Sequence, residues 1–266
     1  MYLCPVCQTS LTRQQQSYGC SNGHSFDIAR KGYVNLLLPH QMNSRTPGDN
    51  AMMVAARRDF LSAGFYQPLV DAIAALANQY GVQTLLDAGC GEGYYACALE
   101  QSGLTVAGVD ISKPAITAAC GRNKAMPWCV ASVAALPYEA GYFDTVLSVF
   151  CFASEAEFAR VLIPGGYLFS VGPGDNHLPA LRQGLYQQVR DYQTEKQQDY
   201  FAEAFEPVDT LKVQFAFNVQ GEHIENLLKM TPHYWHAAPE QQAALLAQTA
   251  LDEQADFVIR LYRKRA

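Results

Sequence analysis

The stretch that decides the fold is residues 85–95, which read Leu85-Leu86-Asp87-Ala88-Gly89-Cys90-Gly91-Glu92-Gly93-Tyr94-Tyr95. An apolar run ends at an acidic residue, three alternating glycines follow, and a helix is expected to begin after them. Because glycine has no Cβ, a ligand can lie against the backbone of such a turn. The first N–H groups of the helix add unpaired donors. The stretch therefore predicts a strand–loop–helix unit that binds a nucleotide-like ligand.

The spacing of the glycines distinguishes between two classes of nucleotide-binding loop. A dinucleotide-binding loop has the pattern G-x-G-x-x-G. This loop instead has G-x-G-x-G behind Asp87, and Tyr94 stands where that motif would place its last glycine. The pattern resembles the S-adenosylmethionine (SAM) loop of class I methyltransferases. The alternative is a tight turn with chance glycines, which the acidic residue and three spaced glycines together disfavour.

Strands and helices alternate after this loop. We expect strands at 84–87, 104–110, 128–131, 143–150 and 167–171, separated by helices at 93–101, 113–120 and 154–162. A helix at 177–192, a strand at 208–219, helices at 222–230 and 239–251, and a strand at 255–262 follow. This order predicts an α/β fold with a Rossmann-like, mostly parallel sheet of seven strands.

Two polar residues follow the next strands at the same edge of the expected sheet. Asp110 ends the second strand, where a carboxylate can accept the ribose hydroxyls of the ligand. The alternative is that Asp110 caps the helix after Ser112. Ser132 follows the third strand, in a segment that resembles the one lining the adenine in methyltransferases.

The N-terminal segment contains the soft ligands of a metal site. Cys4-Pro5-Val6-Cys7 is a C-x2-C pair, and Cys20 and His24 form a C-x3-H pair at zinc-knuckle distance. Thiolate and imidazole ligands suit zinc rather than magnesium or calcium. A lone C-x2-C could be a redox pair, but the second pair favours structural zinc. So short a segment also needs the metal in order to fold.

Length and charge bound the class of protein. The chain has 266 residues and a net charge of −6, yet residues 1–62 carry six basic and three acidic side chains, a net +3 that leaves −9 for the remainder. A basic N-terminal part suggests contact with a polyanion, although ordinary solvated charge explains it equally. With no apolar run of about 18 residues and no apolar signal segment, we expect a cytoplasmic protein without a membrane span.

Residues 32–39 predict a short strand or an extended exit from the zinc-binding segment, and the residues after them predict a linker and two helices. Residues 40–49 are polar and rich in turn residues, and Asp49 can cap a helix that runs to about Ala63 and carries Arg57. A second helix is expected at 66–79. We therefore divide the chain into a zinc-binding domain at 1–38, a linker and helix at 39–63, and a domain at 64–266 that resembles SAM-dependent methyltransferases. The family resemblance described next implies that the first domain recognises RNA.

Motifs along most of the chain resemble one family. Besides the four expected zinc ligands and residues 89–95, they are Gly32-Tyr33-Val34-Asn35-Leu36-Leu37, Pro47-Gly48-Asp49, Ala56-Arg57-Arg58, Tyr66-Gln67-Pro68-Leu69, and Met230-Thr231-Pro232 with Trp235. The set is similar to the bacterial 23S ribosomal RNA guanine-N1 methyltransferase family (RlmA, also RrmA). The resemblance implies SAM and structural Zn²⁺ as cofactors, N1 of a guanine in a 23S rRNA hairpin loop as acceptor, and a homodimer.

The resemblance also implies site residues. Cys4, Cys7, Cys20 and His24 would hold zinc, and Tyr66, Gly91, Glu92 and His177 would contact SAM. With the loop and strand-end positions, the expected cofactor-binding set is Tyr66, Asp87, Gly89, Gly91, Glu92, Gly93, Asp110, Ser132 and His177. No catalytic residue is named, because Glu155 and Asp175 are only candidate bases for removing the N1 proton.

One segment departs from the family. The family has Ala-Pro-Cys after the fourth strand, where this chain has Cys151-Phe152-Ala153. Cys151 reads as a wall residue rather than as a covalent nucleophile. Two alternative functions therefore stay open: a small-molecule methyltransferase whose zinc unit is a lid, and a SAM-binding paralogue that acts through protein contacts.

Overall fold

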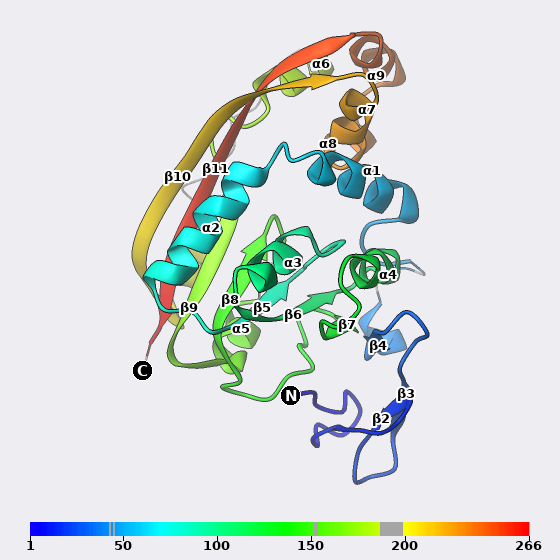
Figure 1. Cartoon of the computed structure of the whole chain (residues 1–266), viewed down its shortest axis with the longest axis vertical. Helices are drawn as coiled ribbons and strands as arrows, with labels where there is room; N and C mark the ends of the chain where they lie inside the picture. The colour runs from blue at the N-terminus through cyan, green and yellow to red at the C-terminus, as the bar shows by residue number, and fades with distance from the viewer. Residues whose placement is uncertain (43, 45, 152–153, 187–198, 266) are drawn as a thin grey trace.

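The computed structural model describes the chain except for residues 43, 45, 152–153, 187–198 and 266. Its main body is an eight-stranded sheet, and a small three-stranded sheet lies at the N-terminal end (Figure 1). The large sheet separates two hydrophobic cores, so that Leu85 packs into one and its neighbour Leu86 into the other. This alternation of buried residues confirms the α/β class.

The large sheet has the strand order β10-β11-β9-β8-β5-β6-β7-β4. The pairs from β4 to β9 are parallel, and β9–β11 and β11–β10 are antiparallel. The strands are β4 (Val34–Asn35), β5 (Thr84–Ala88), β6 (Thr105–Asp110), β7 (Trp128–Val130), β8 (Phe143–Val149), β9 (Leu162–Pro173), β10 (Phe205–Gln220) and β11 (Ala250–Lys264). From β5, the chain adds β6 and β7 on one side of the sheet, and it then adds β8 and β9 on the other side of β5. This reversal creates a crevice at the carboxyl ends of β5 and β8, where open α/β sheets bind ligands.

The count of seven strands was one too few. The eighth strand, β4, pairs in parallel with β7, and the Leu36 N–H donates to the Val130 carbonyl at 2.9 Å. Val34 and Leu36 are buried, so burial holds this two-residue strand against the sheet edge. The segment that follows the zinc ligands is thereby attached directly to the large sheet.

Several helices differ from their expected bounds. The helices are α1 (Ala51–Ser62), α2 (Gln67–Gln79), α3 (Tyr94–Gln101), α4 (Lys113–Arg122), α5 (Glu155–Val161) and α6 (Pro179–Leu185), with short 3-10 turns η1 (Pro39–Gln41) and η3 (Asp199–Phe201). Asn50 caps α1 by accepting from the Met53 N–H at 3.0 Å, so the expected Asp49 cap was wrong. Helix α5 ends early because Leu162 already pairs in β9. The expected helix at 177–192 covers only α6, and its residues 187–192 lie outside the described residues.

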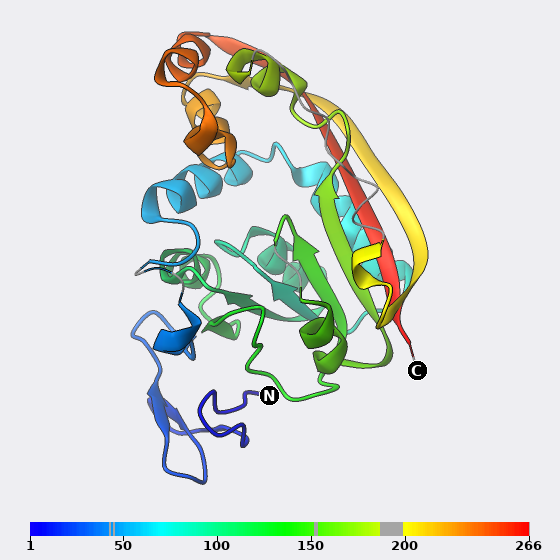
Figure 2. The same ribbon diagram turned by 180° about the vertical axis from the view of Figure 1, so that it is seen from behind.

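The C-terminal hairpin is longer than expected and carries a helical cap. Strands β10 and β11 pair from Phe205↔Lys264 to Gln220↔Ala250. Between them lie α7 (Glu222–Lys229), α8 (His233–His236) and α9 (Pro239–Leu246), which we call the helical cap. Helix α9 is shorter than expected because the chain enters β11 at Ala250. Figures 1 and 2 show the cap beside α1 at the far end of the long strands, and α1 contacts α7.

The zinc unit, residues 1–28, packs against the large domain through an aromatic contact. It contains β1 (Thr12–Arg13), β2 (Ser17–Gly19) and β3 (Ser25–Asp27). The Tyr2 ring lies 5.2 Å from the Tyr18 ring and 5.3 Å from the Tyr138 ring, measured between centroids. Tyr2 therefore serves as a core residue that joins the two domains.

The described residues contain no single helix that is long and apolar enough to cross a membrane, and only the pair α1 and α2, bent by 79°, passes by length and composition.

Candidate cofactor cavity and metal centre

The metal centre brings together the four expected ligands. One ligand atom from each of Cys4, Cys7, Cys20 and His24 lies within 4.8 Å of all the others. The Cys7 and Cys20 sulfurs are 3.7 Å apart, and His24 Nδ1 lies 3.6 Å from Cys4 Sγ and 3.4 Å from Cys20 Sγ. Zinc bonds of roughly 2.3 Å to sulfur and 2.0 Å to nitrogen at tetrahedral angles give edges close to these separations. The donor set and its spacing fit a structural zinc ion.

Turns on either side hold the ligands in place. The Cys4 N–H donates to the Thr9 carbonyl at 2.8 Å, and the Cys20 N–H donates to the His24 carbonyl at 3.0 Å. A hydrogen bond from Thr9 lowers the pKa of the Cys7 thiol to about 5. A thiol with a lowered pKa is ready to bind a metal, because the thiolate is the ligand form.

The cofactor cavity lies at the carboxyl ends of β5, β6, β8 and β9, and α1 and the helical cap also line it. Its volume is about 440 Å³. The expected cofactor residues that line it are Tyr66, Asp87, Gly89, Gly91, Glu92, Asp110 and His177. Two expected residues do not line it: Gly93 caps α3, and the Ser132 hydroxyl accepts from the Ala134 N–H at 3.2 Å. The candidate bases Glu155 and Asp175 are also not among the described residues that line the cavity.

Close packing explains the glycines of the loop. A Cβ on Gly89 would lie 2.1 Å from the Cys151 sulfur, and Gly89 has a φ of +81°. A Cβ on Gly93 would lie 2.8 Å from the Trp128 ring. Both positions therefore require glycine for space as well as for backbone conformation. Cys151 forms part of the cavity wall, as expected from its position after the fourth strand.

Asp110 organises the loop from the neighbouring strand. Its Oδ2 accepts from the Gly91 N–H at 2.8 Å, and its Oδ1 accepts from the Ser112 N–H at 2.7 Å. The cap of α4 is Ser112, whose hydroxyl accepts from the Ala115 N–H, so the structure does not use Asp110 as the cap. Each carboxylate oxygen keeps a further lone pair. These lone pairs can accept the ribose hydroxyls of a nucleoside.

Two further carboxyl groups lie in the cavity wall with little exposure. Asp87 is 1% exposed, and burial together with the charge of Asp110 raises the pKa of its carboxyl to about 8. Burial also raises the pKa of Glu92, although Glu92 pairs with Arg122. Among the described residues, Asp87 Oδ2 and Glu92 Oε1 have no hydrogen-bond partner. Buried carboxyl oxygens without partners fit a cationic ligand such as SAM, which carries a sulfonium and an ammonium group.

An aromatic wall closes the β8 side of the cavity. The His177 ring lies 5.8 Å from Phe150, 4.8 Å from Phe257 and 6.3 Å from Tyr66. Burial, with smaller contributions from His233 and Arg182, lowers the pKa of His177 to about 3. The Asp256 N–H donates to His177 Nδ1 at 3.2 Å. The imidazole is therefore neutral at physiological pH and carries its proton on Nε2.

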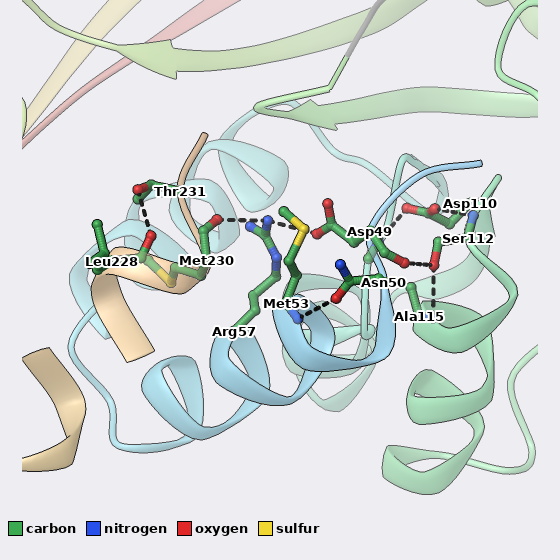
Figure 3. Close-up of polar contacts among 11 residues, drawn as sticks. Asp49, Asn50, Met53, Arg57, Asp110, Ser112, Ala115, Leu228, Met230 and Thr231 are labelled. Carbon is green, nitrogen blue, oxygen red and sulfur yellow. Dashed lines mark hydrogen bonds and ion pairs between the residues drawn. The ribbon is translucent and has the colours of Figure 1, made fainter. Parts of the chain in front are cut away.

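The cavity also contains a clasp that the sequence did not predict. The Arg57 Nη2 donates to Asp49 Oδ2 at 2.9 Å and to the Met230 carbonyl at 3.0 Å, and Ser112 Oγ donates to the Asp49 carbonyl at 2.6 Å. Figure 3 shows Arg57 lying between Asp49 and Met230. The clasp joins the linker, α1 and the helical cap over the glycine loop. A pairing across so much sequence has no local pattern that could reveal it.

Comparisons with known proteins match both units. Residues 2–45 match the family described as "RlmA, N-terminal", which is a zinc ribbon, and residues 86–170 match a methyltransferase domain. The donor cluster and the cavity thus belong to a protein with structural zinc that uses SAM as methyl donor.

Relatives match over most of the chain. The chain is 31% identical to the Streptomyces fradiae 23S rRNA (guanine(748)-N(1))-methyltransferase, with 92% of this chain and 89% of the relative covered. It is 34% identical to Bacillus subtilis (strain 168) YxjB, provisionally named a 23S rRNA (guanine-N(1)-)-methyltransferase, with 93% and 91% covered. A Micromonospora griseorubida protein with the same provisional name is 32% identical, with 98% and 96% covered. The chain is a SAM-dependent methyltransferase that belongs to the 23S rRNA guanine-N1 methyltransferase family.

Proposed function

We propose that this enzyme methylates N1 of a guanine in a hairpin loop of 23S rRNA and that the zinc unit helps to present the RNA. The observation that carries the proposal is the attachment of a zinc ribbon to the same sheet that holds a SAM-type cavity: β4, which follows the zinc ligands, pairs with β7, and the Tyr2 ring packs against the Tyr138 ring. The names of the relatives supply the acceptor. The basic N-terminal part of the chain supports contact with a polyanion.

The residues of the cavity would act by positioning. We propose that Asp110 holds the ribose, that the loop from Gly89 to Gly93 and the carboxyl of Asp87 hold the methionine part, and that Tyr66, Glu92 and His177 complete the site. SAM supplies an electrophilic methyl group when it is bound. Attack on that group needs alignment more than covalent help, so these residues would act by holding the two reactants in line. A neutral His177 adds no positive charge that would repel the sulfonium.

The proposed setting follows from the substrate. We propose that the enzyme works in the cytoplasm, where rRNA is found, and the expected homodimer stays a prediction. The division of the chain into 1–38, 39–63 and 64–266 also stays a proposal, with the added fact that β4 of the first segment joins the large sheet.

Methyl transfer from tritiated SAM tests the acceptor. The protein is incubated with 23S rRNA from a strain that lacks the enzyme and, as a control, with rRNA from the parent strain. We expect tritium in the first rRNA alone and a reverse-transcription stop at one guanine, because an N1 methyl group blocks base pairing. If both rRNA samples stay unlabelled and the deletion removes no N1-methylguanine, the proposed acceptor is wrong.

The same experiment separates the alternatives. A small-molecule methyltransferase would leave rRNA unlabelled and would transfer the label to a low-molecular-weight acceptor in a cell extract. A paralogue that acts only through protein contacts would bind SAM in calorimetry and label neither. RNA binding itself should weaken steeply as salt rises if the enzyme contacts phosphates.

A further inference from the structure

Phe150 stands out at the mouth of the cofactor cavity. It directly follows β8, lines the cavity and is 44% exposed. Its φ is +51°, a left-handed conformation that is rare and strained for a bulky residue. A large apolar side chain is thus held in solvent on a strained backbone, which is the combination found at functional sites.

The surroundings of Phe150 fix one face of its ring. Its N–H donates to the Val171 carbonyl at 3.0 Å. Its ring stacks on His177 with an interplanar angle of 30°, and it meets the Phe257 ring edge-on at 5.7 Å. His177 is in turn fixed by Asp256. The inner side of the ring therefore rests on a rigid base of aromatic groups, while the rest of the ring remains accessible.

The position of Phe150 relative to the glycine loop indicates which end of the cofactor it would face. Asp110 and Ser132 follow β6 and β7, which lie on one side of β5, whereas Phe150 follows β8 on the other side. The next residue, Cys151, packs against Gly89. With the ribose held by Asp110, as proposed above, the methionine part would lie along the glycine loop toward β8, which places the reacting methyl group near Phe150. An acceptor that approaches the methyl group from the β8 side would then meet this ring.

The other exposed aromatic side chains of the described chain lie elsewhere. Tyr142, Tyr200 and Trp235 are all exposed, and none of them lines the cavity. Among the described Phe, Tyr and Trp residues that line the cavity, only Phe150 has an exposed side chain. An unpaired base would find a flat apolar surface at the cavity mouth on this one residue.

We propose that the exposed face of Phe150 is the stacking platform for the acceptor base. The proposal rests on the proposed RNA function and deepens it: the acceptor is a base rotated out of its stack, as enzymes that modify bases require. Bases stack on aromatic rings whatever their identity, with an energy large enough to change affinity about tenfold or more. Stacking fixes the plane of the base, so that its edge can face the methyl group. His177 and Phe257 act as positioning residues beneath the platform.

A double-mutant cycle between ring and base tests the platform. The four combinations pair wild type or Phe150→Leu with a hairpin that carries either the mapped guanine or an abasic nucleotide at that position. We expect the abasic change to weaken hairpin binding to wild type about tenfold and to have little effect on the variant, because the lost contact is the same. Phe150→Tyr keeps the ring and should retain the wild-type difference.

Kinetics and a matched control complete the test. Phe150→Leu should lower kcat/KM for the hairpin about tenfold or more and leave the Kd for SAM within twofold. Tyr142→Leu removes an aromatic ring of similar exposure, 42%, outside the cavity and should change neither value. Equal abasic penalties in wild type and Phe150→Leu overturn the platform, and so does a large rise in the Kd for SAM, which would place the ring on the cofactor. If the wild-type enzyme labels no rRNA, the proposed function itself is wrong. If the wild-type enzyme labels rRNA normally and the effects of Phe150→Leu and of the abasic change are additive, the platform alone is wrong.

Discussion

The four metal ligands of the zinc unit lie between residues 4 and 24, whereas the residues that line the cofactor cavity come from positions 48 to 233. The zinc unit has short strands and needs its metal to replace a large core. The cavity needs no metal, because buried strands hold its glycine loop and hydrogen bonds from distant segments complete it. The comparison teaches that the two regions should lose their structure independently. Local spacing reveals all four ligands of the zinc unit, whereas in the cavity it reveals the glycine loop but not the contacts between distant segments.

The largest expected effect is the loss of the zinc unit's order on metal removal. The free energy of zinc binding to such sites is about 10–16 kcal/mol and contributes directly to folding. After chelation, amide hydrogen exchange should become fast at 17–27 and stay slow at 84–88 and 105–110. Refolding with added Zn²⁺ should restore protection. Slow exchange at 17–27 in zinc-free protein would contradict the account.

A large effect is also expected at Asp110. Replacing it by alanine leaves the partly buried N–H groups of Gly91 and Ser112 without their acceptor, at a cost of up to about 1–3 kcal/mol each. We expect Asp110→Ala to raise the Kd for SAM at least 30-fold in calorimetry, with an unchanged zinc content by metal analysis. Asp209→Ala, an exposed position on β10, is the control. Unchanged SAM affinity in Asp110→Ala would remove the proposed ribose contact.

A moderate effect is expected from the pH dependence that Asp87 imposes on the cofactor-free protein. Its folded-state pKa of about 8 lies above the ordinary value of 3.8, so its stabilising contribution is complete below pH 4 and is lost as the pH rises toward 8. Asp87→Asn cannot ionise. The unfolding free energy of the variant minus that of wild type should therefore increase from pH 5 to pH 8, by more than about 1 kcal/mol. Urea titrations at the two pH values measure this, and a constant difference would mean that Asp87 is ionised in the folded protein.

The smallest effect is expected at the clasp. Arg57→Ala removes the hydrogen bonds to Asp49 and Met230, both in a partly exposed setting where such contacts contribute little. We expect the Kd for SAM to rise about three- to tenfold. The neighbouring Arg58 pairs with Asp59 at the surface and is the matched control, whose alanine variant should stay within twofold. Equal effects of the two variants would show that the clasp does not support the cavity.

Much of the fold was predictable where burial follows a simple period. The strands that became β5 and β6 were placed within one residue of their bounds, because their residues are buried on both faces. The four zinc ligands and the glycine loop were predictable because each depends on local spacing. Of the expected cofactor set, Gly93 and Ser132 have local backbone roles instead of lining the cavity.

The features that were missed depend on contacts between distant segments. A short strand or an extended exit was expected at 32–39, but the pairing of β4 with β7, which joins two distant segments, was missed. Strand β9 begins at Leu162 because its pairing with β8 continues after skipping residues 163–166. Asp49 and Asn50 are equally good helix caps by type, and Arg57 decided between them by taking the Asp49 carboxylate. The clasp and the aromatic wall likewise form between residues that are far apart in the sequence and that only the fold brings together.

The independence of the two regions is tested most directly by measuring both activities in one variant, Cys20→Ser. Calorimetry gives the Kd for SAM, and tritium transfer gives the rate of methylation of 23S rRNA from a strain that lacks the enzyme. We predict a Kd for SAM within about twofold of wild type and a rate of rRNA methylation at least 100-fold lower. Loss of SAM binding together with methylation, or full methylation without the zinc ligand, would contradict the account.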